Sequence, residues 1–176
     1  MKKRILLTMA VAGALLFSGC GGDGNGNNGT NETAVLSQLA FQELRCNQTG
    51  NIAGMGGTLA AFEAAFGAYN TSESHGELSI HTFINRSLVV SFMDDSAIMI
   101  DLQPTPADIA AGRFTVQDVT VGITLEDLLA IDGVSGPYGW DDEHFGRVLN
   151  HELFSYVQSF FIENNVVSRI VITIAG

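Results

Sequence analysis

The chain has 176 residues, a formal net charge of −11 and a hydrophobic fraction of 46%. This hydrophobic content excludes a chain that is disordered throughout. The acidic balance excludes a surface that attracts nucleic acid or anionic lipid by charge, because the only cations beyond Arg4 are five scattered arginines: Arg45, Arg86, Arg113, Arg147 and Arg169.

The first nineteen residues have the pattern of a cleaved secretory signal. Lys2, Lys3 and Arg4 precede an apolar run over residues 5–17. That run is shorter than the roughly 20 residues that a membrane-spanning helix needs, but it is normal for the apolar core of a signal peptide. We therefore predict a signal peptide over residues 1–19.

The end of this run resembles the lipobox of bacterial lipoproteins, in which small residues precede a cysteine. The matching residues are Phe17, Ser18, Gly19 and Cys20. The resemblance implies cleavage before Cys20, a diacylglyceryl group on its sulfur and an acylated amino group. Such multiple acyl chains give stable membrane anchoring. The alternative is an ordinary secretory signal followed by a chance cysteine.

Residues 20–33 are rich in glycine and asparagine, which predicts a flexible tether between the lipid and a single folded domain over residues 34–176. Gly21 stands where inner-membrane lipoproteins often have aspartate, which favours the outer membrane, with the domain facing the periplasm. With Cys20 lipidated, Cys46 has no disulfide partner in the same chain. We expect it to be a buried thiol, with an intermolecular disulfide as the alternative.

Two segments predict short amphipathic helices of the same design. Thr58 and Thr124 are suited to cap the helix starts, and Gly67 and Gly133 are suited to end them. Apolar residues follow at helical spacing, namely Leu59, Phe62 and Phe66 in the first segment and Leu125, Leu128 and Leu129 in the second.

Strands are predicted after each helix, with polar turns between them. The ranges are 78–84, 88–93 and 97–102 in the first half, and 145–149, 153–162 and 166–174 in the second. Residues 103–113, with two prolines, are the predicted connection between the halves. Residues 34–45 are predicted as an N-terminal helix, with a strand through residues 39–44 as the competing prediction.

These elements predict an α+β fold built from two helix-plus-β-meander repeats, with the helices on one face of an antiparallel sheet. The halves span about residues 50–103 and 114–176. The alternative is a coincidence between two ordinary helix-plus-meander units, because the helices and the hairpins align at different offsets.

The second half is similar to the β-lactamase-inhibitor-protein-like fold, a group that includes a small lipoprotein of the outer-membrane β-barrel assembly machine. The matching residues are GITLEDL (122–128), Gly136-Pro137 and FIENNVVSRI (161–170). The resemblance implies helices packed on one face of an antiparallel sheet and a protein that binds other proteins without a catalytic centre.

No residue pattern predicts catalysis or a cofactor. Asp141, Asp142, Glu143 and His144 offer metal-ligating atoms, but consecutive acidic residues are more typical of a solvated loop, and His151 lies an odd number of residues from His144, on the other face of a regular strand. We predict no metal site and no enzyme activity, since no nucleophile, base and orienting group are recognisable together.

Tyr138 and Trp140 stand out in the glycine-rich loop GPYGW (136–140). Tyrosine and tryptophan are common anchors of protein interfaces because they bring a large contact area with few torsions to order. One hypothesis is that they form part of a partner-binding loop. The other is that they fold back to cap the end of the sheet.

Taken as a sequence, the chain predicts a lipoprotein of the bacterial envelope that binds a protein partner as a scaffold, assembly factor or inhibitor-like binder. A carrier or sensor of a small apolar ligand, held between sheet and helices, is the alternative. Nucleic acid is not expected as a partner.

Overall fold

The computed structural model describes residues 41–138, 143–150 and 155–175. The described strands are β1 (Phe41–Cys46), β2 (Ile52–Met55), β3 (Thr71–His75), β4 (Leu78–Phe83), β5 (Leu88–Met93), β6 (Ser96–Leu102), β7 (Phe114–Val116), β8 (Val119–Thr120), β9 (His144–Asn150), β10 (Ser155–Glu163) and β11 (Val166–Ala175). The described helices are α2 (Leu59–Phe66), α3 (Pro106–Ala110) and α4 (Leu125–Leu129), and a 3₁₀ turn, η1 (Ile84–Arg86), joins β4 to β5.

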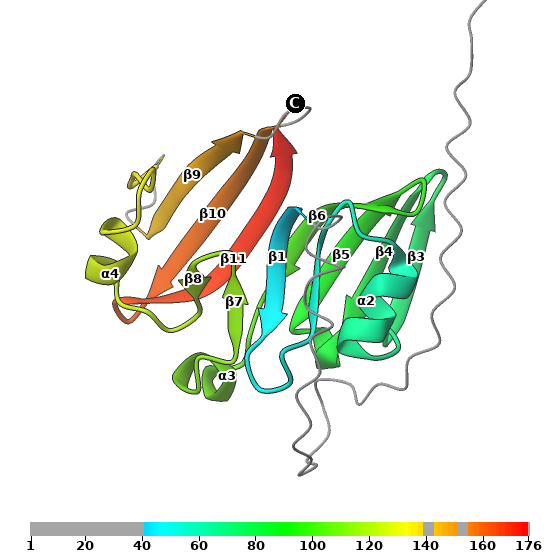
Figure 1. Ribbon diagram of the computed structural model, residues 1–176, viewed down its shortest axis with the longest axis horizontal. Coiled ribbons are helices and arrows are strands. Elements are labelled where there is room, and N and C mark those ends of the chain that lie inside the picture. The colour runs from blue at the N-terminus through cyan, green and yellow to red at the C-terminus, as the bar shows by residue number, and fades with distance from the viewer. Residues whose placement is uncertain (1–40, 139–142, 151–154, 176) are drawn as a thin grey trace, which may run out of the picture.

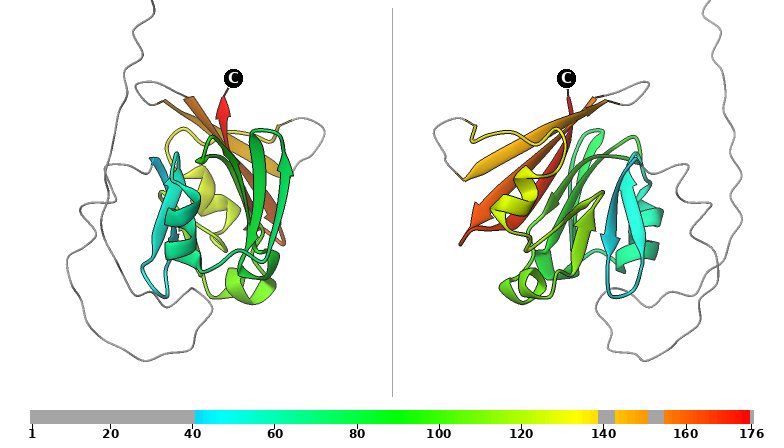
Figure 2. Two further views of the ribbon diagram at one scale, coloured as in Figure 1. Left: turned by 90° about the vertical axis from the view of Figure 1, so that its right-hand side faces the viewer. Right: turned by 60° about the vertical axis from the view of Figure 1, so that its left-hand side comes forward.

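The described strands form two antiparallel sheets (Figure 1). The larger sheet has seven strands in the order β3-β4-β5-β6-β11-β10-β9, and the smaller has four in the order β2-β1-β7-β8. Figure 2 shows them as separate layers, with the small sheet and the helices on one side of the large sheet. We call the covered side of the large sheet its inner face and the opposite side its outer face.

The predicted α+β fold of two helix-plus-β-meander repeats is wrong. The described structure is mostly antiparallel β, and its three helices are only eight, five and five residues long. The four-stranded sheet, which the sequence did not predict, shares the inner face with these helices. Its strands come from both predicted halves, so neither half is a self-contained repeat.

Several individual elements agree with the sequence prediction. The side chains of Thr58 and Thr124 cap α2 and α4 by accepting hydrogen bonds from Ala61 N and Asp127 N. Gly67 ends α2 at a φ of 82°, which favours glycine. The six predicted strands coincide with β4, β5, β6, β9, β10 and β11.

Two segments differ from their prediction. The described part of the expected N-terminal helix is strand β1, as in the competing prediction, because Leu44 and Cys46 alternate into the core and the strand pairs with β2 and β7. The connection over residues 103–113 contains helix α3, whose start is stabilised by a reciprocal capping box between Thr105 and Asp108.

The core lies between the inner face and the layer that covers it. Phe62 of α2 is fully buried and packs edge-to-face on Phe92 of β5 with ring centroids 5.5 Å apart. Leu128 of α4 is fully buried, and Leu59 and Leu125 pack against the same core. The apolar side of α2 and the Leu125 and Leu128 part of α4 therefore face inward, as their spacing predicts, but Leu129, which was predicted on the same apolar side, is 48% exposed.

An ion pair between a buried arginine and an exposed aspartate joins the two sheets. Arg147 of β9 is only 5% exposed and faces the core, where its Nε donates to Oε1 of Gln158 at 2.6 Å. Its terminal nitrogens donate to the carboxylate of Asp118, in the turn between β7 and β8. Hydrogen bonding from Arg147 lowers the pKa of Asp118 below its ordinary value, although burial acts in the opposite direction.

Replacing Asp118 by alanine is expected to lower the free energy of unfolding by about 1–3 kcal/mol, because it leaves a buried guanidinium without its carboxylate. The expected loss is below that for a fully buried pair because the Asp118 side chain is 56% exposed and water can partly replace it. Since folding lowers the pKa of Asp118, its contribution is complete above pH 3.8 and is lost as the pH falls through the folded value.

Urea unfolding of Asp118→Ala beside Asp132→Ala measures this effect. Asp132 is an exposed aspartate whose replacement controls for the loss of one negative charge. Equal stabilities of the two variants would show that the ion pair contributes nothing.

Candidate functional site

The outer face of the seven-stranded sheet is a broad surface on which no described helix or strand packs (Figure 2). The pairing register arranges its side chains in two complete rows from β3 to β9. The first row contains Thr71, Thr82, Val89, Asp101, Val171, Ser159 and Gly146. The second contains Glu73, Ile80, Ser91, Met99, Thr173, Val157 and Val148.

This face is unusually apolar for one that meets solvent. Antiparallel sheets with one covered face normally place polar side chains on the other. Here the outer positions of the central strands carry valine, isoleucine and methionine in alternation with threonine, serine and the single acidic residue Asp101, and Val148 and Met93 are 59% and 44% exposed. In an acidic chain, a wide surface with few charges is typical of a site that contacts another molecule.

A ridge of stacked side chains borders the two rows. The ring of Phe161 lies parallel to that of His144, with centroids 4.9 Å apart and an interplanar angle of 1°. On its other side the guanidinium of Arg169 lies 4.9 Å from the Phe161 centroid. Because these spacings equal the distance between neighbouring strands, the rings face one another along the sheet and present their edges outward.

Arg169 is held in this ridge by an ion pair with Asp101. Its Nε and one terminal nitrogen donate to the two carboxylate oxygens at 2.8 and 2.7 Å, and Gln103 donates to the same carboxylate at 2.7 Å. Hydrogen bonding to Asp101 raises the pKa of Arg169 above its ordinary value. The opposite charges of Arg169 and Asp101 thus neutralise each other at the centre of the outer face. The Arg169 side chain remains 41% exposed.

Tyr138 lies beside this ridge. Its backbone N–H donates to the His144 carbonyl at 2.8 Å, and its ring makes a tilted contact with the His144 ring at 6.2 Å. The ring lies next to Gly146 of β9, where a Cβ would be in ordinary contact with its Cε2 at 3.5 Å and would clash with the Gln158 carbonyl oxygen at 2.8 Å. The ring is 45% exposed and bonds through its hydroxyl to Ser135, so it extends the outer face beyond β9.

The chain before Tyr138 also covers the edge of β9. Ser135 and Gly146 exchange two backbone hydrogen bonds of 2.9 Å, which makes residue 135 a short bridge along that edge. Trp140, the other residue of the predicted partner-binding loop, lies outside the described residues.

The sequence did not group His144, Phe161 and Arg169. They are brought together by strand register alone, since Phe161 pairs with both other residues. One feature of the sequence could have indicated this surface. In strands such as 166–174, apolar residues occupy both odd and even positions, which indicates a sheet with apolar side chains on both faces.

Among the described residues, no group of three histidine, cysteine, aspartate or glutamate side chains could hold a metal ion. His144, one of the possible ligands, stacks on Phe161. Asp141, Asp142 and His151 lie outside the described residues.

Cys46 lies fully buried at the end of β1, and its sulfur is disulfide-bonded. The expected burial is therefore confirmed, but the expected free thiol is not. The sequence contains one other cysteine, Cys20, which lies outside the described residues together with the tether. A lipid thioether and a disulfide cannot share one sulfur, so the chemistry of Cys20 decides which partner Cys46 can have.

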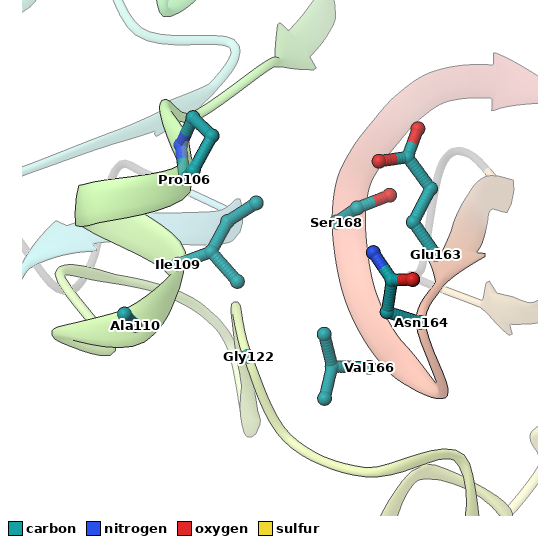
Figure 3. Close-up of a pocket in the computed structure, with 8 residues that line it drawn as sticks. All are labelled: Pro106, Ile109, Ala110, Gly122, Glu163, Asn164, Val166 and Ser168. Atoms are coloured by element: carbon teal, nitrogen blue, oxygen red, sulfur yellow. The ribbon is translucent and has the colours of Figure 1, made fainter.

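A groove of about 330 Å³ lies between α3 and the β10–β11 turn (Figure 3). Pro106 and Ile109 form its apolar side, and Glu163, Asn164 and Ser168 form a polar side opposite them. A carrier of a small apolar ligand would need an enclosed apolar cavity. This groove is open and half polar, so it does not favour the carrier hypothesis.

Comparison with known proteins adds little to this geometry. No family model and no curated protein matches the chain. A similar solved structure is that of a DUF4309 family protein (YjgB) from Bacillus subtilis subsp. subtilis str. 168. The two chains are 14% identical, the match covers 67% of this chain and 78% of that chain, and the TM-score is 0.37.

None of the helices in the described ranges has the length and apolar character needed to cross a membrane.

Proposed function

We propose that this protein is a lipid-anchored protein of the bacterial envelope that binds a protein partner through the outer face of its seven-stranded sheet. The observation that carries the proposal is the outer face itself. It is wide, low in charge and rich in apolar side chains, and no described element covers it.

The chemistry of this surface suits a protein partner. Tyrosine, phenylalanine and arginine are enriched in interface centres, and Tyr138, Phe161 and Arg169 lie close together at one end of the outer face. The net charge of −11 opposes contact with anionic lipid or nucleic acid. The partner is therefore a protein with an apolar surface of low negative charge.

The anchor completes the proposal, and it requires that the disulfide of Cys46 is formed with another chain, since a lipidated Cys20 cannot be its partner. A lipid on Cys20, followed by the glycine-rich tether, would hold the domain near the outer membrane on its periplasmic side while leaving it free to turn its outer face toward a partner. We propose binding alone, without catalysis or a cofactor, because the ionisable side chains described on this face are paired or stacked rather than gathered in a cleft.

Photo-crosslinking in the native envelope tests the interface. A photoreactive side chain at Val148, on the outer face, is expected to give a discrete adduct with one protein. The same group at Leu129, an exposed residue of α4 away from this face, is expected to give none. Met93 offers a second exposed position on the outer face for the same photoreactive group. Identical adduct patterns at Val148 and Leu129, or no adduct from either Val148 or Met93, would contradict the proposal.

The crosslinked partner then allows a binding measurement. Val148→Glu places a charge in the interface and is expected to weaken binding by about 30-fold or more, the effect of losing a contact of about 2 kcal/mol. Leu129→Glu adds the same charge at a similarly exposed site and is expected to leave binding unchanged. Unfolding curves of both variants should match the parent, since both side chains are largely exposed.

The mass of the intact mature chain tests the anchor. We expect it to begin at Cys20 and to carry a diacylglyceryl group and an additional acyl chain, while Cys20→Ser remains unlipidated. An unlipidated chain that gains two hydrogen atoms on reduction would instead show a disulfide between Cys20 and Cys46. That result would contradict the proposed membrane anchor. The proposed interface would still be tested by the crosslinking and binding experiments.

A further inference from the structure

His81, in β4, is a buried histidine with an unsatisfied ring nitrogen. It faces the inner side of the sheet and is only 5% exposed, with Tyr69 at 4.7 Å and Phe92 at 5.4 Å between ring centroids. Its Nε2 lies 3.2 Å from the hydroxyl of Ser79, whereas its Nδ1 has no hydrogen-bond partner.

This setting accepts a neutral imidazole and disfavours a charged one. A neutral ring can carry its proton on Nε2 and leave a bare lone pair on Nδ1. The imidazolium would bury a second N–H without an acceptor, together with a positive charge. Burial accordingly lowers the pKa of His81 below 6.5, and the carboxylate of Glu63 on α2 opposes this only in part.

The described ionisable groups that face His81 are few. They are the Glu63 carboxylate and the Tyr69 phenol, while the residues beside His81 in the neighbouring strands are Ser72 of β3 and Val90 of β5, which carry no charge. Protonation of His81 therefore meets one carboxylate, that of Glu63, whose attraction opposes the effect of burial only in part.

The structure next to His81 is the part of the sheet that can open most easily. Every residue of β3 is exposed, and among the described strands β3 pairs only with β4. The segment before it is held to the sheet by the ring contacts of Tyr69 with His81 and Phe83, and by two hydrogen bonds of Asn70. Its N–H donates to the Thr82 carbonyl at 2.6 Å, and its Oδ1 accepts from the Asn85 N–H at 2.9 Å. Edge elements with few buried contacts open locally at low free-energy cost.

We propose that His81 makes the β3 edge of the sheet acid-sensitive: when the imidazole gains its second proton, Tyr69 leaves the ring and β3 separates from β4. The remainder of the sheet stays folded, because β4 keeps its full pairing with β5. This inference is independent of the proposed partner and of the lipid anchor.

The direction of the pH dependence follows from linkage. Because folding disfavours the protonated ring, closure of β3 is most stable above pH 6.5 and weakens as the pH falls toward the pKa of the folded state. In the opened state at about pH 5.0, a histidine of ordinary pKa has a protonated population about 30 times its neutral population. The population of the opened edge is therefore expected to rise by about 3- to 30-fold between about pH 7.5 and pH 5.0.

Hydrogen exchange of the full chain measures this opening. After correction for the intrinsic pH dependence of exchange, the amides that bond β3 to β4 should lose protection by that factor, while those that bond β4 to β5 and β5 to β6 should not. In His81→Phe, an aromatic ring that does not titrate, the difference between the two pH values is expected to disappear. His75→Gln removes an exposed histidine of β3 itself and should retain the parent behaviour.

Equal loss of protection in His81→Phe and the parent would overturn the proposal, as would abolition of the effect by His75→Gln. If His81→Phe does not fold, an NMR titration of the parent imidazoles gives the decision. A pKa of His81 at or above 6.5 in the folded chain would overturn the proposal, and a lower value accompanied by acid-dependent loss of the β3 signals would support it.

Discussion

The antiparallel pairing of β6 with β11 is the contact on which the rest of the molecule depends. It joins strands β3 to β6 to strands β9 to β11. Without it, the seven-stranded sheet would divide into one sheet of four strands and one of three. On the inner face the pair Leu102–Ile170 lies in the core. On the outer face Asp101 and Arg169 form a two-point ion pair across the same seam. Such non-local pairing is costly in chain entropy and is stabilised here from both faces.

The joined sheet is covered on one face only. The four-stranded sheet, α2, α3 and α4 all lie against the inner face, and the Arg147–Asp118 ion pair fixes the turn of β7 and β8 to the far end of it. The outer face must therefore be stable in water without a covering layer. Its valine and isoleucine side chains are half-buried by their neighbours in the central strands, and only Val148, on the edge strand β9, is largely exposed. That arrangement leaves apolar area available to a partner at little cost in solubility.

The sequence predicted the six longer hairpin strands and the two capped helices because each has a local signature: alternation, polar turns and threonine caps. It did not predict the four-stranded sheet, because β2, β7 and β8 have only four, three and two residues and so carry almost no periodicity. Their identity as strands depends on partners far along the chain, as in the pairing of Leu44 with Val116. The two helix-plus-hairpin segments resemble each other in sequence, which led to the wrong prediction of a repeat.

The candidate site was predictable only at its margin. Tyr138 was noticeable because aromatic residues are unusual in a glycine-rich loop, and the structure places it beside the outer face. The central residues are ordinary in sequence: His144, Phe161 and Arg169 become a group only when three strands are aligned in register. Lipidation of Cys20 is predicted from a short local motif and does not depend on the fold. It remains a prediction.

A large sheet offers a partner two edges and its uncovered face, and the structure distinguishes between them. The β9 edge is already used near its start, where Ser135 and Tyr138 bond to its backbone. The β3 edge is formed by TSESH, a wholly exposed and polar strand of the kind that discourages pairing with another chain. The outer face has neither restriction, since from β4 to β10 its apolar side chains alternate only with small hydroxyl residues and with Asp101, which is paired with Arg169. For the proposed partner, the structure therefore favours contact with side chains over pairing with the backbone.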